Sequence, residues 1–382
     1  MKKLCFITTI SSTVRSFLLP VLSYYAQHTD WDLTVICDDD PLLQQQLPKG
    51  VKYHPISMKR GISLGGVAAC WKMYNFFRKE KFDLVQYSTP NAAFYASIAA
   101  TLAGVPVRLY CQWGMVFVGM KGIKRQIFKT IEKLVCFLST WIEPDSHGNL
   151  EFCRAQKLYT AAKSSVVWNG SASGVNLEKF DIAQKNNWRQ KIRTKYNIDE
   201  NTFVYGFVGR INGDKGINEL FTAFQKILHM HPQRYLMLVG NPEISDSVDP
   251  ALYNWAQQSS QVLFCGYTDT VEQYLSAMDV YILPSYREGF GSGVIEAEAM
   301  GVPVIVTDIP GPTNAMVPNV TGLVVPKQDT SALYESMICL PEQADLCKSF
   351  GEAGFRFATE KFEQQALCHH ILNDRKRLLG ER

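Results

Sequence analysis

Short apolar segments, each followed by polar or small residues and then by a helix-like stretch, recur along the whole chain. This alternation limits the possible folds more than any other feature. In the first half, such segments run from Leu4 to Thr8, Leu33 to Cys37, Phe82 to Tyr87 and Val107 to Cys111. Their length and apolarity are typical of buried parallel strands. Because strand–loop–helix alternation builds a doubly wound parallel sheet, the first half predicts an α/β domain.

The alternation is interrupted by residues 169–181, which are rich in Gly, Ser and Asn, and then restarts. The later apolar segments are Phe203 to Val208, Tyr235 to Val239, Val262 to Cys265, Val280 to Leu283, Val304 to Thr307 and Gly322 to Val325. A chain of 382 residues fits two domains of similar size. We therefore expect two Rossmann-like domains facing a central cleft, over residues 1–180 and 181–361. A final helix within 362–382 is expected to pack back on the first domain.

Composition excludes several classes of protein. The formal net charge is only +3, which argues against a nucleic-acid-binding protein. The ten cysteines are scattered without a Cys-x-x-Cys pair, so we expect free thiols in a reducing compartment and no zinc site. The apolar start of the chain is short and lacks a small-residue cleavage site, which favours a first strand over a signal peptide. The longest apolar run, Leu134 to Ile142, is about half a membrane span, and a cytoplasmic protein is expected.

The strongest motif runs from Glu288 to Glu296 with the sequence EGFGSGVIE. Two carboxylates are separated by a glycine-rich turn that follows an apolar strand and leads into a helix. In open α/β sheets, ligands bind at the carboxyl ends of strands, so the loop is expected to face a ligand. Its glycines allow backbone N–H groups to approach an anion closely. The alternative is a glycine-rich turn with two solvated glutamates.

A second motif, Gly209 to Gly216 with the sequence GRINGDKG, follows another strand and opens a helix. Arg210 and Lys215, held beside a helix N-terminus, could neutralise the negative charge that grows on a departing diphosphate without a metal. A Walker phosphate loop is excluded because the Gly-Lys-Ser/Thr ending is missing. The alternative is an ordinary basic pair on the surface.

These motifs belong to an ordered series over most of residues 165–330. Its segments are Val167 to Gly170, Phe207 to Arg210, Lys215-Gly216, Leu238 to Gly240, Val262 to Tyr267, Ala277 to Val280, Leu283 to Gly291, Glu296-Ala297, Gly301 to Ile305 and Gly322 to Pro326. The series resembles the retaining glycosyltransferases of the GT-B superfamily that carry a Glu-x7-Glu element, of the group 1 or family 4 type. The resemblance implies that the chain transfers a hexosyl or N-acetylhexosaminyl group from a nucleotide-diphosphate donor.

The resemblance also implies roles for individual residues. Arg210 and Lys215 hold the diphosphate, Glu288 contacts the hydroxyls of the donor sugar, and Glu296 accepts hydrogen bonds from the ribose. The other residues expected to bind the donor are Gly209, Gly240, Gly266, Tyr267, Gly289, Phe290, Gly291 and Ser292, with Gly266 and Tyr267 near the base. Relatives of this type usually need no cofactor or divalent metal. UDP is the expected carrier by frequency, although GDP and other carriers stay open.

The expected mechanism follows from the charge argument. A double displacement with retention needs a carboxylate nucleophile beside the anomeric carbon, and the sequence offers no residue for that role. Attack by the acceptor hydroxyl on the face that the diphosphate leaves is therefore favoured.

Two other kinds of protein remain as alternatives. A GT-B phosphorylase would need a pyridoxal phosphate lysine and usually a longer chain; a non-catalytic nucleotide-sugar-binding protein would not need the full set of charged residues.

The first half is expected to bind the acceptor, and here the sequence departs from the family pattern. Ser11-Ser12 and then Arg15 stand where relatives often carry a Gly-Gly pair, and Gln112-Trp113-Gly114 stands where they often carry His-Gly. Arg15, Trp113 and His147 are the candidate acceptor-binding residues. The alternatives are a tryptophan packed at the domain edge and a structural histidine, which is the more common role of a lone histidine. The run Asp38-Asp39-Asp40 is interpreted as a solvated loop, not as a metal motif.

One segment suggests membrane contact. If Met120 to Leu138 is a helix, Ile123, Ile127, Ile131, Leu134 and Leu138 share one face, and Lys121, Arg125, Lys129 and Lys133 share the opposite face, with Lys124 at the flank. A basic amphipathic helix can dock on anionic lipid. The alternative is a helix packed on the sheet with a solvated basic face. Because similar enzymes of surface polysaccharide, capsule or O-antigen assembly use polyprenyl-diphosphate-linked acceptors, peripheral contact with the cytoplasmic face of a membrane is a reasonable hypothesis.

Overall fold

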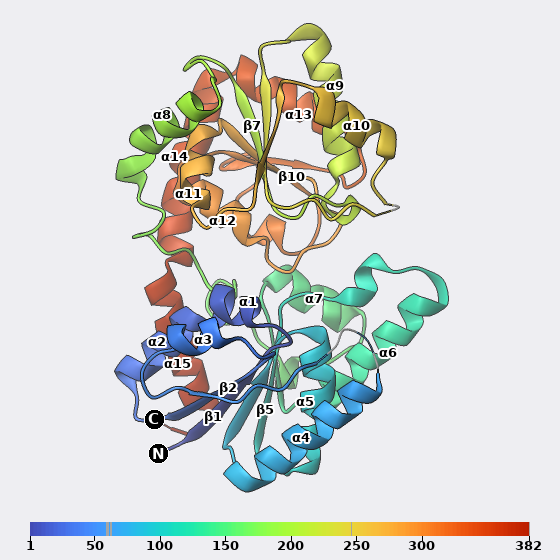
Figure 1. The fold of residues 1–382 in the computed structure, drawn as a ribbon, viewed down its shortest axis with the longest axis vertical. Coiled ribbons are helices and arrows are strands. Elements are labelled where there is room, and N and C mark those ends of the chain that lie inside the picture. Colours follow the sequence, from blue (N-terminus) through green and yellow to red (C-terminus); the bar gives the residue numbers. More distant parts are fainter. Residues whose placement is uncertain (59–60, 62, 246, 382) are drawn as a thin grey trace. The chain divides into compact units, whose positions relative to one another are not determined.

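The computed structural model describes residues 1–58, 61, 63–245 and 247–381. The chain forms two units, each with its own six-stranded parallel sheet (Figure 1). Unit 1 contains Met1–Ser173 and Gln364–Arg382, and unit 2 contains Gly174–Glu363. The sequence predicts the boundaries at 180/181 and 361/362. The first boundary is observed earlier, at 173/174, and the second slightly later, at 363/364. Both shifts follow from the pairing of Val175 with Glu363, in which the Val175 N–H donates to the carbonyl of Phe362 at 2.8 Å.

The sheet of unit 1 has the order β3-β2-β1-β4-β5-β6. Its strands are β1 (Lys3–Ile7), β2 (Asp32–Ile36), β3 (Lys52–Tyr53), β4 (Leu84–Tyr87), β5 (Val107–Gln112) and β6 (Trp141–Pro144). Its helices are α1 (Ser11–Thr13), the π-helical segment Val14–Leu18, α2 (Leu19–His28), α3 (Pro41–Gln46), α4 (Leu64–Glu80), α5 (Pro90–Leu102), α6 (Gly122–Leu138), α7 (His147–Ala155) and α15 (Gln364–Leu378), with short 3₁₀ segments at Val116–Gly119 and Ala161–Lys163.

Two apolar layers cover the two faces of this sheet. Helices α4, α5 and α6 pack over one face with Met73, Phe77 and Val135 in the core, and α2 and α15 pack over the other with Leu22 and Leu367 (Figure 1). Right-handed crossovers between parallel strands account for this division, because the chain reverses its direction across the sheet after β3. The C-terminal helix therefore completes a core that begins at residue 4.

Unit 2 has the sheet order β12-β11-β10-β7-β8-β9. Its strands are β7 (Val204–Val208), β8 (Tyr235–Val239), β9 (Val262–Gly266), β10 (Val280–Leu283), β11 (Val304–Thr307) and β12 (Gly322–Val325). Its helices are α8 (Lys185–Lys195), α9 (Ile217–Met230), α10 (Pro250–Gln258), α11 (Val271–Ala277), α12 (Ser292–Ala299), α13 (Thr330–Glu342) and α14 (Ala344–Phe362), with 3₁₀ segments at Ile182–Gln184, Gly213–Lys215 and Pro312–Asn314. The four strands β8, β10, β11 and β12 match the predicted bounds.

The predicted helix over residues 120–138 begins later, at Gly122, after the 3₁₀ segment Val116–Gly119. Within the described ranges, no helix combines the length and apolarity needed to cross a bilayer.

Candidate functional site

Two loops of unit 2 lie against each other at the carboxyl edge of its sheet. One joins β7 to α9 and the other joins β10 to α12, and β7 and β10 are neighbouring strands. Their closest approach is at Gly216, where a Cβ atom would overlap the carbonyl oxygen of Pro284. Gly216 has φ of +69°, which also disfavours residues with a side chain. The glycine after Lys215 therefore allows the two loops to meet.

Lys215 and Glu288 form an ion pair across this contact. The Lys215 ammonium donates to a carboxylate oxygen of Glu288, and the two side chains are only 18% and 12% exposed. Lys215 lies in the 3₁₀ segment before α9, and Glu288 lies in the glycine-rich loop before α12. Limited contact with water makes the electrostatic interaction stronger than in a surface pair. The sequence predicted both residues as functional, and the structure brings them together.

The two residues before Glu288 are also bound to the β7–α9 segment. The backbone N–H of Tyr286 donates to the carbonyl of Asp214 at 2.9 Å, and its hydroxyl donates to Glu219 at 2.6 Å. The guanidinium of Arg287 donates to the Asp214 carboxylate at 2.6 and 3.1 Å. These contacts were not predicted from the sequence, although the charge pattern Asp-Lys in one loop and Arg-Glu in the other was a usable signal. Together these contacts fix the positions of Lys215 and Glu288 relative to each other.

The N-terminus of α12 directly follows this loop. Gly291 is its N-cap and no side chain caps the helix, so the amides of its first turn, beginning at Ser292, have no side-chain acceptor. Such amides and the helix dipole favour an anion. Phe290 turns its ring into the core against Phe362, with ring centroids 5.2 Å apart, so only its backbone is available to a ligand. The carbonyl of Gly289 packs against Gly311.

Three glycines lie at the carboxyl ends of the neighbouring strands β7, β8 and β9: Gly209 and Gly240 follow β7 and β8, and Gly266 ends β9. The N–H of Gly209 donates to Val239 at 2.9 Å, and the N–H of Gly240 donates to Gly266 at 2.8 Å. A Cβ atom at Gly240 would overlap the carbonyl oxygen of Gly209. The structure therefore brings the predicted glycines together as one stretch of half-buried backbone. Tyr267 follows them, with its side chain exposed and its hydroxyl donating to Asp269 at 2.6 Å.

Arg210 is placed differently from Lys215. Its guanidinium is exposed and forms an ion pair with Glu243 at 2.8 Å. The structure therefore does not include Arg210 in the Lys215–Glu288 pair. Glu243 belongs to the segment after β8, and no pattern in the sequence indicates that this segment supplies a partner.

Glu296 lies one turn further along α12. Burial, together with the nearby carboxylate of Glu272 and against the opposing effect of Lys179, raises the pKa of Glu296 to about 7. Lys179 also approaches Glu272, at 3.9 Å. A carboxyl group with this pKa gains or loses its proton near neutral pH, so its acceptor capacity depends on pH.

The candidate acceptor residues lie in unit 1, after β1, β5 and β6. Arg15 is in the π-helical segment, and its guanidinium binds Asp40 at 2.6 Å and Gln46 at 2.7 Å. Trp113 is partly buried, with its ring 5.2 Å from that of Phe17. His147 is exposed at the first position of α7. All three lie at the carboxyl edge of their sheet, as expected from the sequence.

The Asp38–Asp40 run has structural roles. Asp38 accepts a hydrogen bond from the backbone N–H of Ser11 at 2.6 Å, and Asp40 caps α3 through the N–H groups of Leu42 and Leu43. Hydrogen bonds from Ser11 and Arg15 lower the pKa of Asp40 to about 2. Within the described part of the chain, no three His, Cys, Asp or Glu side chains are grouped as metal ligands.

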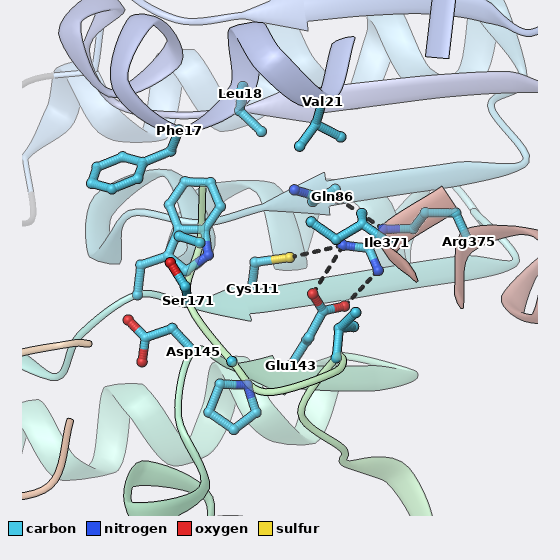
Figure 2. Close-up of a pocket in the computed structure, with 15 residues that line it drawn as sticks. Phe17, Leu18, Val21, Gln86, Cys111, Glu143, Asp145, Ser171, Ile371 and Arg375 are labelled. Carbon is cyan, nitrogen blue, oxygen red and sulfur yellow. Dashed lines mark hydrogen bonds and ion pairs between the residues drawn. The ribbon is translucent and has the colours of Figure 1, made fainter. Parts of the chain in front are cut away.

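A buried polar network in unit 1 lines a small cavity near Trp113 (Figure 2). Arg375 of α15 donates to both oxygens of Glu143, at 2.5 and 3.1 Å, to Gln86 at 3.2 Å and to the Cys111 sulfur at 3.5 Å. The cavity measures about 20 Å³, which is room for roughly one water and not for a sugar. Arg375 was not predicted from the sequence, although its spacing from Cys368 and Ile371 places it on the apolar face of α15.

Comparison with known proteins agrees with this architecture. Residues 3–142 match the family described as "Glycosyl transferase 4-like", and residues 189–357 match the family "Glycosyl transferases group 1". The capsular polysaccharide biosynthesis glycosyltransferase CapM of Staphylococcus aureus is 32% identical over 320 residues, which cover 83% of each chain. The chain belongs to the group 1 glycosyltransferases.

Two further similarities concern a more distant relative and the fold. The UDP-Gal:α-D-GlcNAc-diphosphoundecaprenol α-1,3-galactosyltransferase of Escherichia coli is 26% identical over 315 residues, covering 81% of this chain and 79% of that one. The solved structure of Anabaena HepE in complex with UDP and glucose has a TM-score of 0.79 at 18% identity, covering 98% of this chain and all of that one. This group 1 glycosyltransferase therefore has the GT-B fold, with the loops described above in its C-terminal unit.

Proposed function

We propose that this glycosyltransferase moves a hexosyl or N-acetylhexosaminyl group from a UDP-sugar to a saccharide carried on a polyprenyl diphosphate, with retention of anomeric configuration. The observation that carries the proposal is the Lys215–Glu288 pair beside the uncapped N-terminus of α12. It combines a cation for the leaving diphosphate, the backbone amides that begin α12 for phosphate oxygens, and a carboxylate for sugar hydroxyls.

In the proposed reaction, the bond between the anomeric carbon and the diphosphate oxygen breaks, and its electron pair stays on the oxygen. Lys215 and the first-turn amides of α12 stabilise that charge as it grows. The acceptor hydroxyl forms its new bond to the anomeric carbon on the same face, and its proton passes to a departing phosphate oxygen. Glu288 orients the sugar through its hydroxyls, and Glu296 accepts from the ribose. Arg210 reaches the diphosphate after leaving Glu243.

The acceptor class is inferred from the relatives. The E. coli relative is described as acting on a sugar linked to undecaprenyl diphosphate, and CapM belongs to capsular polysaccharide biosynthesis. We assign this chain to the assembly of a bacterial surface polysaccharide of the capsule or O-antigen kind. Unit 1 supplies the acceptor residues Arg15, Trp113 and His147. No disulfide joins any of the ten cysteines, which supports a reducing, cytoplasmic location, and α6 supports peripheral contact with the membrane.

The test is release of UDP from a panel of UDP-sugars, with and without a lipid-linked saccharide acceptor. Release should depend on the acceptor, and nuclear magnetic resonance of the product should show the anomeric configuration of the donor. Lys215→Ala and Glu288→Ala should each reduce kcat by about 100-fold or more, because each removes one partner of the developing charge. Lys226→Ala, a change of an exposed lysine on α9, is the matched control and should keep the normal rate.

Two outcomes would reject the proposal. Near-normal rates in both site variants would show that the pair is not catalytic. Binding of a UDP-sugar without turnover across the acceptor panel would support a non-catalytic nucleotide-sugar-binding protein instead.

Because the proposed charge stabilisation comes from Lys215 and backbone amides, transfer should also continue at an unchanged rate in excess EDTA.

A further inference from the structure

Unit 2 has a cavity at the edge of its sheet opposite to the loops of Lys215 and Glu288. It lies where the neighbouring strands β11, β10 and β7 begin, beside Pro303, Asp279 and Phe203. The first residues of α8 and the junction between α13 and α14 also line it. Its volume is about 290 Å³, near the lower end of the volumes of small-molecule sites, roughly 300–1,000 Å³. No residue assigned above to the donor or the acceptor lines this cavity.

Lys185, the first residue of α8, is partly buried where it lines this cavity, which we call the Lys185 cavity. Its ammonium group donates to the carbonyl of Gly301 at 2.9 Å. Gly301 has φ of +59°, and a Cβ atom there would stand only 3.4 Å from the ammonium nitrogen, so a glycine suits this contact. Across the described ranges, Lys185 has no other hydrogen-bond acceptor and no carboxylate within ion-pair distance. An ammonium group has three N–H donors, so two remain for a ligand.

The electrostatic surroundings of Lys185 favour an anionic ligand. Burial, together with the charge of Arg189 and against the opposing effects of Asp279 and Cys347, lowers the pKa of Lys185 to about 8. The positive charge of Lys185 is therefore poorly stabilised by the groups around it. A bound anion would stabilise this charge, whereas a neutral or cationic ligand would not.

The charge of the whole lining is also positive. Besides Lys185, the cations Arg189 and Lys348 line the cavity, and Asp279 is the one carboxylate among the described lining residues. Asp279 is already neutralised, because its two oxygens accept hydrogen bonds from Arg189 at 2.9 Å and from Arg193 at 2.8 Å. An anion entering the cavity would therefore meet an excess of positive charge.

The junction between α13 and α14 supplies two further features of the cavity. Leu340 and Pro341, at the end of α13, give it an apolar wall. Ala344 begins α14, a helix of 19 residues whose N-terminus has no side-chain cap, so the first amides add partial positive charge. The acidic residue of this first turn, Asp345, is not part of the lining. The cavity thus combines a cationic side with an apolar one.

We propose that the Lys185 cavity binds a phosphate group, carried by a small organic molecule or present as the free ion. The phosphate oxygens accept hydrogen bonds from Lys185 and Lys348, and the body of an organic phosphate lies against Leu340 and Pro341. Free phosphate fills only the cationic side, so an organic phosphate should bind more tightly. The proposal goes beyond the proposed sugar transfer and does not depend on it, because the two sites share no residue.

The test is calorimetric titration of the full-length chain with glucose 6-phosphate and, separately, with inorganic phosphate. Both titrations are made with saturating UDP, so that the loops of Lys215 and Glu288 are occupied. Lys185→Met should weaken the binding of glucose 6-phosphate by roughly tenfold or more, because it removes a charged hydrogen-bond donor. Lys191→Met, which changes an exposed lysine of the same helix outside the cavity, is the matched control and should bind normally.

A second variant guards against a folding defect. Lys348 is exposed and makes no ion pair within the described part of the chain, so Lys348→Glu should leave the fold intact. It places a negative charge at the cavity and should weaken the binding of both phosphates, by roughly tenfold for glucose 6-phosphate.

The position of the ligand can be measured at two cysteines. Cys347 lines the cavity, whereas Cys339 lies earlier, on α13, and does not; both are partly buried. Glucose 6-phosphate should slow the alkylation of Cys347 by iodoacetamide in proportion to the occupied fraction of the chain. Alkylation of Cys339, followed by mass spectrometry in the same sample, should keep its rate.

Tighter binding of glucose 6-phosphate than of inorganic phosphate would support an organic phosphate as the ligand, and equal binding would support the free ion. Three results would overturn the proposal. The first is that neither phosphate binds the wild-type chain in the presence of UDP. The second is that Lys185→Met and Lys348→Glu both bind glucose 6-phosphate as the wild type does. The third is that binding leaves the alkylation rate of Cys347 unchanged, which would place the ligand elsewhere.

Discussion

At the scale of single residues, the Lys215–Glu288 pair explains how one site can serve both a phosphate and a sugar. Without a donor, each charge compensates the other in a mostly buried position. A diphosphate beside α12 would compete for the Lys215 ammonium, and the Glu288 carboxylate would then be free to accept hydrogen bonds from sugar hydroxyls. The pair therefore leaves neither charged group without a partner in the unliganded protein.

Glu296 gives the donor site a specific pH dependence. Its pKa of about 7 means that its carboxyl group is mostly protonated at pH 6 and mostly ionised at pH 8. The ionised group accepts hydrogen bonds with both of its oxygens, whereas protonation turns one of them into a donor and weakens acceptance from the ribose hydroxyls. We therefore predict that the Kd for UDP, measured by calorimetry, is about tenfold lower at pH 8 than at pH 6, which follows from the change in the ionised fraction.

The control for this prediction is Glu296→Gln over the same pH range. UDP carries a phosphate that also titrates, and the variant isolates that contribution because its amide does not. An identical pH profile in both proteins would contradict the role of Glu296. The stability of unit 2 should show the opposite pH trend. The pKa of Glu296 in the folded protein lies above its ordinary value, so the contribution of Glu296 to that stability is lost as pH rises through about 7.

At the scale of helices and strands, the sequence predicts what depends on apolar periodicity. Four strands of unit 2 have the predicted bounds, because each apolar run there is followed by a glycine, a proline or a charged residue. Strand β3 was missed because two residues, Lys52–Tyr53, give no pattern. Strand β6 was missed because the run from Leu134 to Ile142 contains both the end of α6 and the beginning of this strand.

In the candidate site, too, some contacts are predictable from the sequence and others are not. The meeting of Lys215 and Glu288 was predictable, since both follow neighbouring strands of a parallel sheet. The pairing of Arg210 with Glu243 was not, because it depends on the path of a loop. Arg375 was not predictable as a buried cation, because its partners Glu143 and Gln86 are far away in the sequence.

Arg375 links α15 to the buried polar network of unit 1, so substitution of Arg375 should destabilise this unit. Arg375→Ala leaves the buried Glu143 carboxylate without its cation, and we expect unit 1 to lose about 3–5 kcal/mol of stability. Hydrogen exchange of peptides from β4, β5 and β6 in increasing urea should show the loss, while peptides from β7 to β12 should not change.

Two further variants separate charge from packing at this position. Arg377→Ala removes a neighbouring arginine that is exposed and paired with Asp374, and it should cost less than about 1 kcal/mol. Arg375→Met combined with Glu143→Leu removes both charges and should recover most of the stability. If the double variant is as unstable as Arg375→Ala, the packing of α15 and not the buried charge is what matters.

At the scale of the whole molecule, the two units differ in how the chain builds them. Unit 2 is one continuous segment, Gly174–Glu363, whereas unit 1 needs both ends of the chain. The side chain of Gln364 donates to the carbonyl of Ser173 at 3.0 Å, so the points where the chain leaves and re-enters unit 1 are joined. Unit 2 can therefore fold as soon as its own segment is complete, and unit 1 must wait for α15.

This difference predicts the behaviour of fragments. The main apolar core of unit 2 extends from Val175 to Phe362, and the Lys215–Glu288 pair, the glycines after β7 to β9 and Glu296 all lie within the same segment. A fragment of residues 174–363 should therefore fold alone and bind UDP within about tenfold of the full-length affinity, because the proposed donor contacts are complete in it. It should not transfer sugar, since the acceptor residues belong to unit 1.

The complementary truncation, residues 1–363, tests the same argument from the other side. Without α15, the apolar face formed by Leu18, Val21 and Leu22 loses its cover of Leu367 and Ile371, and Glu143 loses Arg375. Unit 1 of this truncation should exchange its amide hydrogens rapidly, while UDP binding by unit 2 persists. If 174–363 fails to bind UDP but 1–363 binds it normally, residues of unit 1 must contribute to the nucleotide site, and the assignment of donor binding to unit 2 alone would be wrong.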